Sequence, residues 1–261
     1  MNNRVGPIDR PGAAERTQDA GDPMAESALK YELDGKVAVL TMDDGRANAV
    51  THGMIEALHA ALDRAEKEAH ATLLLGRPGR FSAGFDLSVM TAGPDQARGL
   101  VKAGAELLIR MYLHPQPLIA GCTGHALAAG ALLLLASDTR LGTAGEFKIG
   151  LNEVSIGLRL PIFGIELARD RLSKRYFTGA TIGGTVYSPE DAKAAGYLDR
   201  VVSPDDLVAA ARAEAARQAD LPTGALAQTK KDARASVVAH VKATLAEDMK
   251  SMGPPTNVSK K

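Results

Sequence analysis

Hydrophobic and polar residues alternate along the chain in short runs that predict strands and helices. Alternation on both sides of Asp34-Gly35, over residues 31–42, predicts a β-hairpin, because Asp-Gly is a strong two-residue turn signal. Residues 51–69 repeat apolar side chains with helical spacing, and Thr51 is suited to cap the first turn, so an amphipathic helix is expected there. Further strands are expected at 72–75, 118–121, 139–142 and 146–149, and further helices at 95–113, 126–136, 189–195, 205–219, 225–235 and 237–249.

The most apolar stretch lies at residues 117–136. A membrane-spanning helix needs about 20 uninterrupted apolar residues, whereas Thr123, Gly124 and His125 interrupt this stretch in its middle. The stretch therefore divides into a buried strand and a helix that is hydrophobic on every side, and no membrane span is predicted.

The order of these elements predicts an α/β protein. Strands alternate with helices in the first part of the chain, and Ala-rich helices follow Tyr187, which is typical of an α/β core with a helical appendage. The predicted divisions are a disordered leader at 1–27, a core at 28–200 and a C-terminal helical region at 201–261. The leader is rich in charged residues without an apolar segment, which excludes a secretory signal, and Met24 is an alternative start of the protein.

Composition narrows the range of functions. Lys and Arg number 31 and Asp and Glu number 31, and the net charge of zero argues against nucleic acid or an anionic membrane surface as a partner. The single cysteine, Cys122, excludes a disulfide framework, fits a cytoplasmic protein and is expected to be a small core residue. The histidines lack metal-site spacing, and the sequence contains neither nucleotide-binding glycine motifs nor a serine-hydrolase elbow, so no metal or cofactor is expected.

Two segments with small residues, 81–87 and 124–130, follow predicted strands and are candidates for ligand contact. Gly84 and Gly130 allow the backbone to approach a ligand closely, and a helix that begins near the second segment has unpaired amides at its N-terminus. Two amides aimed at one point would form an oxyanion hole. The alternative is that these turns only solve a packing problem.

The chain resembles the crotonase superfamily of enoyl-CoA hydratases and isomerases in three motifs that follow the order and spacing of that family. The motifs are Phe81-Ser82-Ala83-Gly84-Phe85-Asp86-Leu87, Gly124-His125-Ala126-Leu127-Ala128-Ala129-Gly130, and Ile149-Gly150-Leu151-Asn152-Glu153 with Ile156-Gly157 and Pro161. The resemblance extends over residues 31–202. It implies a spiral of ββα units, an acyl-CoA thioester as substrate with coenzyme A as part of it, and a homotrimer or hexamer.

The resemblance also implies roles for residues in these motifs. The backbone N–H groups of Phe85 and Ala129 match the oxyanion-hole donors, which hold the thioester carbonyl and stabilise an enolate, and Glu153 matches the catalytic acid. Alanine at Ala128 and Ala129, where many members have glycine, is expected to be tolerated, because backbone donors need no particular side chain. Substrate-binding roles are implied for Ala83, Asp86, Gly130 and Leu132, and Phe85, Met90, Leu132 and Phe163 are candidates for lining an acyl pocket.

The residue pattern favours isomerisation over hydration. Family hydratases use a second glutamate two residues beyond the glycine matched by Gly130, and that position is Leu132 here. Hydration requires an oriented water and a delivered proton, whereas moving a double bond from position 3 to position 2 requires one base. Residues 149–153 also resemble those of the Δ3,Δ2-enoyl-CoA isomerases. The alternatives are weak or altered hydratase activity and a non-catalytic acyl-CoA-binding protein. Leu132 motivates the second alternative, because half of the hydratase acid machinery is missing, and Ser88 also stands where some relatives place a basic residue for the CoA phosphates.

Several polar residues near these motifs could have a functional or a structural role. Asp86 either contacts the ligand or caps the helix that follows it, and Asp138 is expected to end the buried helix. Arg159 either lowers the pKa of Glu153, contacts a polar acyl tail, or is a solvated loop residue. His125 either touches the ligand or packs against its neighbours.

Overall fold

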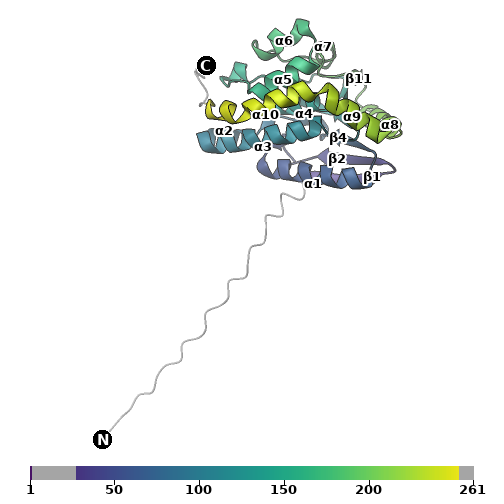
Figure 1. The fold of residues 1–261 in the computed structure, drawn as a ribbon, viewed down its shortest axis with the longest axis horizontal. Helices are drawn as coiled ribbons and strands as arrows, with labels where there is room; N and C mark the ends of the chain where they lie inside the picture. The colour runs from purple at the N-terminus through teal and green to yellow at the C-terminus, as the bar shows by residue number, and fades with distance from the viewer. Residues whose placement is uncertain (2–27, 253–261) are drawn as a thin grey trace.

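The computed structural model describes residues 28–252 together with Met1, and the chain there forms successive strand–strand–helix units followed by a helical end (Figure 1). The strands are β1 (Leu29–Asp34), β2 (Val37–Met42), β3 (Ala49–Val50), β4 (Ala71–Leu75), β5 (Gly79–Ser82), β6 (Gly84–Phe85), β7 (Leu118–Cys122), β8 (Gly124–Leu127), β9 (Thr139–Thr143), β10 (Ile149–Gly150) and β11 (Arg200–Val202). The helices are α1 (His52–Glu68), α2 (Leu87–Ala92), α3 (Pro94–Tyr112), α4 (Ala129–Ala136), the 3-10 helix η1 (Val154–Ile156), α5 (Ile162–Arg171), α6 (Lys174–Thr181), α7 (Pro189–Ala195), α8 (Leu207–Gln218), α9 (Thr223–Ala233) and α10 (Ala235–Lys250).

The largest sheet has six strands in the order β1-β2-β4-β7-β9-β11. The predicted hairpin is confirmed: β1 and β2 pair antiparallel with Asp34 opposite Val37, and Gly35 supplies a positive φ of 58° in the turn. The other strand pairs are parallel. Parallel strands need crossover connections, and the helices between them provide these.

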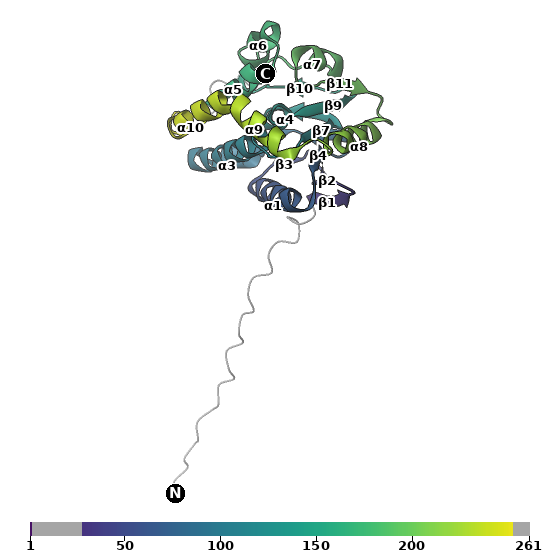
Figure 2. The same cartoon turned by 45° about the vertical axis from the view of Figure 1, so that its right-hand side comes forward.

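Both faces of this sheet are covered by helices. Leu73 and Leu75 of β4 pack with α8, whereas Leu74 between them belongs to the core cluster on the opposite face, with residues of α1, α3 and α4. Figure 2 shows α8 on one side of the strands and α1 and α3 on the other. Cys122 is buried in the same core cluster as Leu74, as expected for a small core residue. Strands that are buried on both faces have nearly continuous apolar sequences, and β4 and β7 both have such sequences.

Two small sheets, with strand orders β10-β8-β5 and β3-β6, branch off from the main sheet. The predicted helix at 126–136 is therefore wrong in its first turn, because residues 124–127 form β8, which pairs with β5 and β10. The helix α4 begins at Ala129 and is buried along its whole length. Of the strand expected at 146–149, only Ile149 lies in a strand, the two-residue β10.

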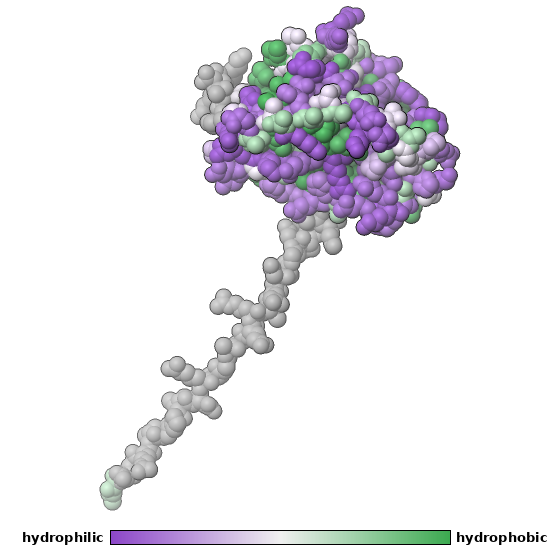
Figure 3. Space-filling view, viewed as in Figure 1, coloured by the Kyte–Doolittle hydropathy of each residue, from purple (hydrophilic) through white to green (hydrophobic). Residues whose placement is uncertain are grey.

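The C-terminal part of the described chain returns to the core. Strand β11 pairs with β9, so the expectation of helices alone after Tyr187 is wrong at this point. Strand β11 also crosses the predicted division at residue 200, and the division itself stays a prediction. Helix α10 packs on α5 and α3, and Figure 3 shows hydrophobic residues grouped around it on an otherwise mainly hydrophilic face. Apart from Met1, the predicted leader at 1–27 lies outside the described residues.

The buried ammonium group of Lys230 links α9 to the chain segments next to β7 and α4. The Lys230 ammonium donates hydrogen bonds to the carbonyl oxygens of His114 and Gln116 and to Asp138 Oδ2, at 2.6, 2.8 and 2.7 Å. Asp138 also accepts from the Leu118 amide and pairs with Arg234. Asp138 therefore has a structural role after the end of α4, because its carboxylate joins Lys230 of α9 to the start of β7.

Candidate active site

The two glycine-containing segments meet in space. Gly84 has a φ of 96°, and a Cβ at this position would lie 2.8 Å from Ala128 Cβ and 3.1 Å from the Ala129 nitrogen. A Cβ at Gly130 would lie 2.3 Å from the Ser82 carbonyl oxygen. Any other residue at these two positions would push the segments apart, so glycine is required here for close approach.

This contact brings together the two amides predicted to form an oxyanion hole. Phe85 ends β6, and Ala129 is the first residue of α4, whose first-turn amides have no acceptor within the helix. Among the described residues, no hydrogen bond from the Ala129 amide is found. The N-terminus of α4 also carries the positive end of the helix dipole, which attracts negative charge.

The backbone reaches this arrangement through strain at one residue. Ala128, which precedes α4, has φ 49° and ψ −124°, a conformation that residues with a Cβ rarely adopt. Such a conformation costs about 1–3 kcal/mol. The expectation that alanine is tolerated at 128 and 129 therefore needs a qualification. The predicted donor, the Ala129 amide, does not require glycine, but Ala128 before it adopts a conformation that is typical of glycine.

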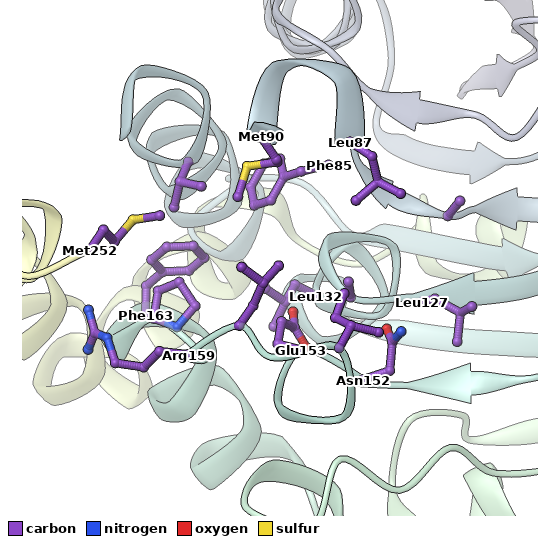
Figure 4. Close-up of a pocket in the computed structure, with 16 residues that line it drawn as sticks. Phe85, Leu87, Met90, Leu127, Leu132, Asn152, Glu153, Arg159, Phe163 and Met252 are labelled. Atoms are coloured by element: carbon purple, nitrogen blue, oxygen red, sulfur yellow. The ribbon is translucent and has the colours of Figure 1, made fainter. Parts of the chain in front are cut away.

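A cavity of about 320 Å³ opens beside these amides. Its lining contains all four residues predicted for an acyl pocket, and in full consists of Ala83, Phe85, Leu87, Met90, Val101, Leu127, Ala128, Leu132, Asn152, Glu153, Ile156, Leu158, Arg159, Pro161, Phe163 and Met252. In Figure 4, Glu153 and Leu132 lie in the middle, Asn152 and Leu127 toward one end, and Arg159 and Met252 toward the other. The walls are mostly apolar, which suits a hydrocarbon chain.

Glu153 is the carboxylate in this cavity. It is only 8% exposed, and its Oε2 has no hydrogen-bond partner among the described residues. Burial raises the pKa of Glu153 to about 7, because the charged form loses water and a hydrogen bond to its own backbone offsets only part of that loss. Its carbonyl oxygen accepts from the Ile156 and Leu158 amides, and Gly157 in the left-handed region ends the turn. The loop therefore holds the carboxyl group in place through its backbone.

The remaining predicted residues are distributed around the cavity. Ala83 and Leu132 line it, whereas Asp86 and Gly130 do not. The Asp86 side chain accepts from the Ser88 amide and hydroxyl and so caps α2, which is the structural interpretation given above. His125 lies outside this cavity, where its Nδ1 accepts from the Lys148 amide.

Arg159 lines the cavity and is held by the last turn of α10. Its guanidinium donates to Asp248 Oδ1 at 2.6 Å and to the Ser251 hydroxyl at 3.1 Å. It is not among the groups that shift the pKa of Glu153. The interpretation of Arg159 as a solvated loop residue is therefore incomplete, since a buried carboxylate fixes its position. Asp248 lies 89 residues further along the chain, and no local sequence pattern indicated this contact.

Two absences among the described residues bear on the class of site. Within residues 28–252, no group of three or more histidine, cysteine, aspartate or glutamate side chains is arranged to hold a metal ion. The helices of that same part of the chain include none with the length and apolar character needed to cross a membrane.

Comparison with known proteins identifies the family. A family model described as enoyl-CoA hydratase/isomerase matches residues 32–260. This chain belongs to the enoyl-CoA hydratase/isomerase family. The predicted family and the crotonase-type fold with a helical C-terminal region are thereby confirmed.

Solved and curated relatives carry both names of the enoyl-CoA hydratase/isomerase family. The crystal structure of a family member from Pseudomonas syringae is 44% identical with a TM-score of 0.86, covering 88% of this chain and 100% of that one. Human mitochondrial enoyl-CoA delta isomerase 1 is 28% identical over 84% of this chain and 78% of its own length. A probable enoyl-CoA hydratase from Bacillus subtilis is 34% identical, and that match spans about half of each protein, 51% of this chain and 52% of the relative. The names support an enzyme of this family, and the site chemistry has to distinguish between the two reactions.

Proposed function

We propose that the protein is an enoyl-CoA isomerase that moves a double bond of an acyl-CoA thioester from position 3 to position 2 with Glu153 as its only base. The observation that carries this proposal is the pairing of one buried carboxyl group, Glu153, with the apolar Leu132 in the same cavity. A single carboxylate can remove a proton from C2 and return it at C4. Leucine neither moves a proton nor holds the water that hydration consumes.

The amides of Phe85 and Ala129 would stabilise the intermediate. When the proton leaves C2, negative charge moves onto the thioester oxygen, and two N–H donors facing that oxygen stabilise the enolate. One such donor typically contributes about 10²–10³-fold in rate. The close approach of their two segments through Gly84 and Gly130 supports this assignment.

The raised pKa of Glu153 suits both halves of this reaction. A carboxyl group with a pKa of about 7 is a stronger base than an exposed glutamate and is still ionised in part at neutral pH. After it has taken the proton, it is also a competent acid toward C4. The absence of a hydrogen-bond partner on Oε2, among the described residues, leaves that oxygen available to the substrate.

Hydration of a 2-enoyl-CoA is the second candidate, because curated relatives carry that name. We expect it to be slow, since one carboxyl group would have to activate water and deliver a proton in the same step. A non-catalytic acyl-CoA-binding protein is the third candidate. The trimeric or hexameric state, the absence of a cofactor and the cytoplasmic location stay predictions, with the oligomeric state open to measurement by light scattering.

The experiment compares 3-hexenoyl-CoA and crotonyl-CoA as substrates and follows the absorbance of the conjugated thioester. We expect absorbance to rise with 3-hexenoyl-CoA and to fall only slowly with crotonyl-CoA. Glu153→Gln should lower the isomerase rate by about 10²–10⁴-fold, because the base is lost, and should retain binding of the CoA ester.

Glu146→Gln is the matched control, since Glu146 is an exposed glutamate seven residues earlier in the chain. It should keep the full rate. Retained activity in Glu153→Gln would remove Glu153 from the mechanism. Binding without a change in absorbance for either substrate would favour the non-catalytic protein.

A further inference from the structure

Within the part of the chain that the structure describes, the side chain of Asn152 has no hydrogen-bond partner, although it lines the cavity. Asn152 Oδ1 is buried without a hydrogen bond, and no bond from Nδ2 is found among the described residues. Only its backbone is held, since the main-chain oxygen accepts from the Ser155 hydroxyl at 2.7 Å. Buried polar groups are nearly always paired, because an unpaired one loses its hydration without compensation. A buried, unpaired carboxamide oxygen in a cavity therefore points to a ligand donor that pairs with it.

The position of Asn152 shows which part of a ligand it would meet. Asn152 and Leu127 lie toward the end of the cavity opposite Arg159 and Met252 (Figure 4). A thioester carbonyl held at the Ala129 amide divides the ligand into an acyl chain on one side and a sulfur arm on the other. The wall formed by Phe163 and Met252 is apolar and suits the acyl chain. The sulfur arm then leaves past Leu127 and Asn152.

The chemistry of that arm matches a carboxamide. In a CoA thioester, two methylene groups follow the sulfur, and an amide follows them. An amide has one N–H donor and one carbonyl acceptor, and the asparagine side chain offers an acceptor and donors in return. Asn152 carries no charge and so is poorly matched to a phosphate, which prefers cationic donors.

We propose that Asn152 is a substrate-binding residue whose carboxamide hydrogen-bonds the amide nearest the sulfur of the thiol arm. This inference rests on the proposed function for the identity of the ligand. It gives the enzyme a way to distinguish pantetheine thioesters from simple alkyl thioesters close to the reacting carbon. A hydrogen bond from the ligand N–H would also give Asn152 Oδ1 the partner that it lacks among the described residues.

The test measures binding of two saturated thioesters, which contain no double bond to move. S-hexanoyl-N-acetylcysteamine keeps the amide next to the sulfur arm, and S-pentyl hexanethioate replaces it with methylene groups of the same chain length. Calorimetric titration gives the Kd of each ligand for the full-length protein and for Asn152→Leu. We expect the substitution to weaken the cysteamine ester by about 3–10-fold and to change the pentyl ester by less than about 2-fold.

Two controls separate this role from a structural one. Ser155→Ala removes the bond to the Asn152 backbone and leaves the carboxamide, so it should not change the ratio of the two Kd values. The melting temperature of Asn152→Leu should not fall, because no protein hydrogen bond is lost. If Asn152→Leu does not fold, Asn152→Ala gives the same comparison.

Each outcome decides the proposal. Equal weakening of both esters, or no weakening of either, would overturn it. Wild-type protein that binds neither ester would overturn the role of Asn152, whereas the isomerase is decided separately by the absorbance assay with 3-hexenoyl-CoA. Selective weakening of the cysteamine ester, in a protein that does not convert 3-hexenoyl-CoA, would keep the role of Asn152 and reject only the isomerase.

Discussion

In the proposed mechanism, the ionisation of Glu153 sets the dependence of activity on pH. A base acts in its deprotonated form, so kcat/KM for 3-hexenoyl-CoA should rise with pH and level off above the pKa of about 7. An exposed glutamate would give the same rise near pH 4–5. The pH profile of kcat/KM, measured with Tm followed in parallel, checks this. A rise centred near pH 4–5 would contradict the assignment of the base to the buried carboxyl group of Glu153.

The same ionisation affects stability with a defined sign. Because the pKa of Glu153 is higher in the folded protein than in the unfolded chain, the folded state binds the proton more tightly. The contribution of Glu153 to the free energy of unfolding is therefore most favourable below about pH 4.5 and declines as pH rises through about 7. In Glu153→Gln this decline should be absent, which comparison of Tm against pH for the two proteins would show.

Ala128 offers a test of backbone strain. Glycine adopts its φ of 49° without a steric penalty, so Ala128→Gly should relieve about 1–3 kcal/mol of strain and lose less than about 1 kcal/mol to the entropy of the unfolded chain. The expected net effect is a Tm higher by a few degrees. Ala131→Gly, inside α4, is the matched control and should lower Tm. A decrease in both variants would show that residue 128 is not strained.

Single residues differ in how far the sequence alone identified them. The family motifs predicted Glu153, Phe85 and Ala129 for one site. Glu153 and Phe85 line the cavity, whereas Ala129 is not among the lining residues, and the roles of all three stay predictions. The strain at Ala128 and the unpaired carboxamide of Asn152 depend on backbone angles and on the positions of distant atoms. Neither property has a signature in a run of neighbouring residues.

At the scale of elements, the contact between α10 and α5 shapes the far end of the cavity. Asp248, which is 2% exposed, accepts from the Ile162 amide at the start of α5 and from Arg159. Asp248→Ala should lower the free energy of unfolding by about 1–3 kcal/mol, because buried donors lose their acceptor. Since Met252 follows on the same segment, KM should rise more for long acyl chains than for short ones.

Chemical denaturation and KM values for 3-hexenoyl-CoA and 3-dodecenoyl-CoA would check this. Glu247→Ala is the control, because Glu247 is the exposed neighbour of Asp248 and pairs only with exposed Lys250. It should change stability by less than about 0.5 kcal/mol. Equal effects of the two substitutions would show that Asp248 does not anchor α10.

Elements with local signals were predicted, and those defined by distant partners were not. Helix α1 carries its periodicity and its Thr51 cap within the segment, and the hairpin carries its own turn. Residues 124–127 have small and apolar side chains that suit a helix or a strand, and their pairing with β5, some 45 residues earlier, decides in favour of β8. The three residues of β11 are too few to show alternation.

At the scale of the whole molecule, the order of parallel strands places the site. Strands β4 and β7 are neighbours in register, with Leu73 opposite Ile119, so the segments that follow them emerge at the same edge of the sheet. This is how residues 81–87 and 124–130 meet. The α/β class could be predicted from the alternation of elements, whereas the spiral arrangement came from the family resemblance, because small branching sheets leave little trace in periodicity.

The shielding of Glu153 has a consequence for the fate of an isotope. A proton taken from C2 by a carboxyl group with little access to bulk water should often return to the same substrate before it exchanges. With deuterium at C2 of 3-hexenoyl-CoA, the product should carry part of the label at C4, on the same face of the molecule, because one carboxyl group serves both carbons. Mass spectrometry and NMR of the product would measure this retention. Complete washout into solvent would indicate that water reaches the base during turnover.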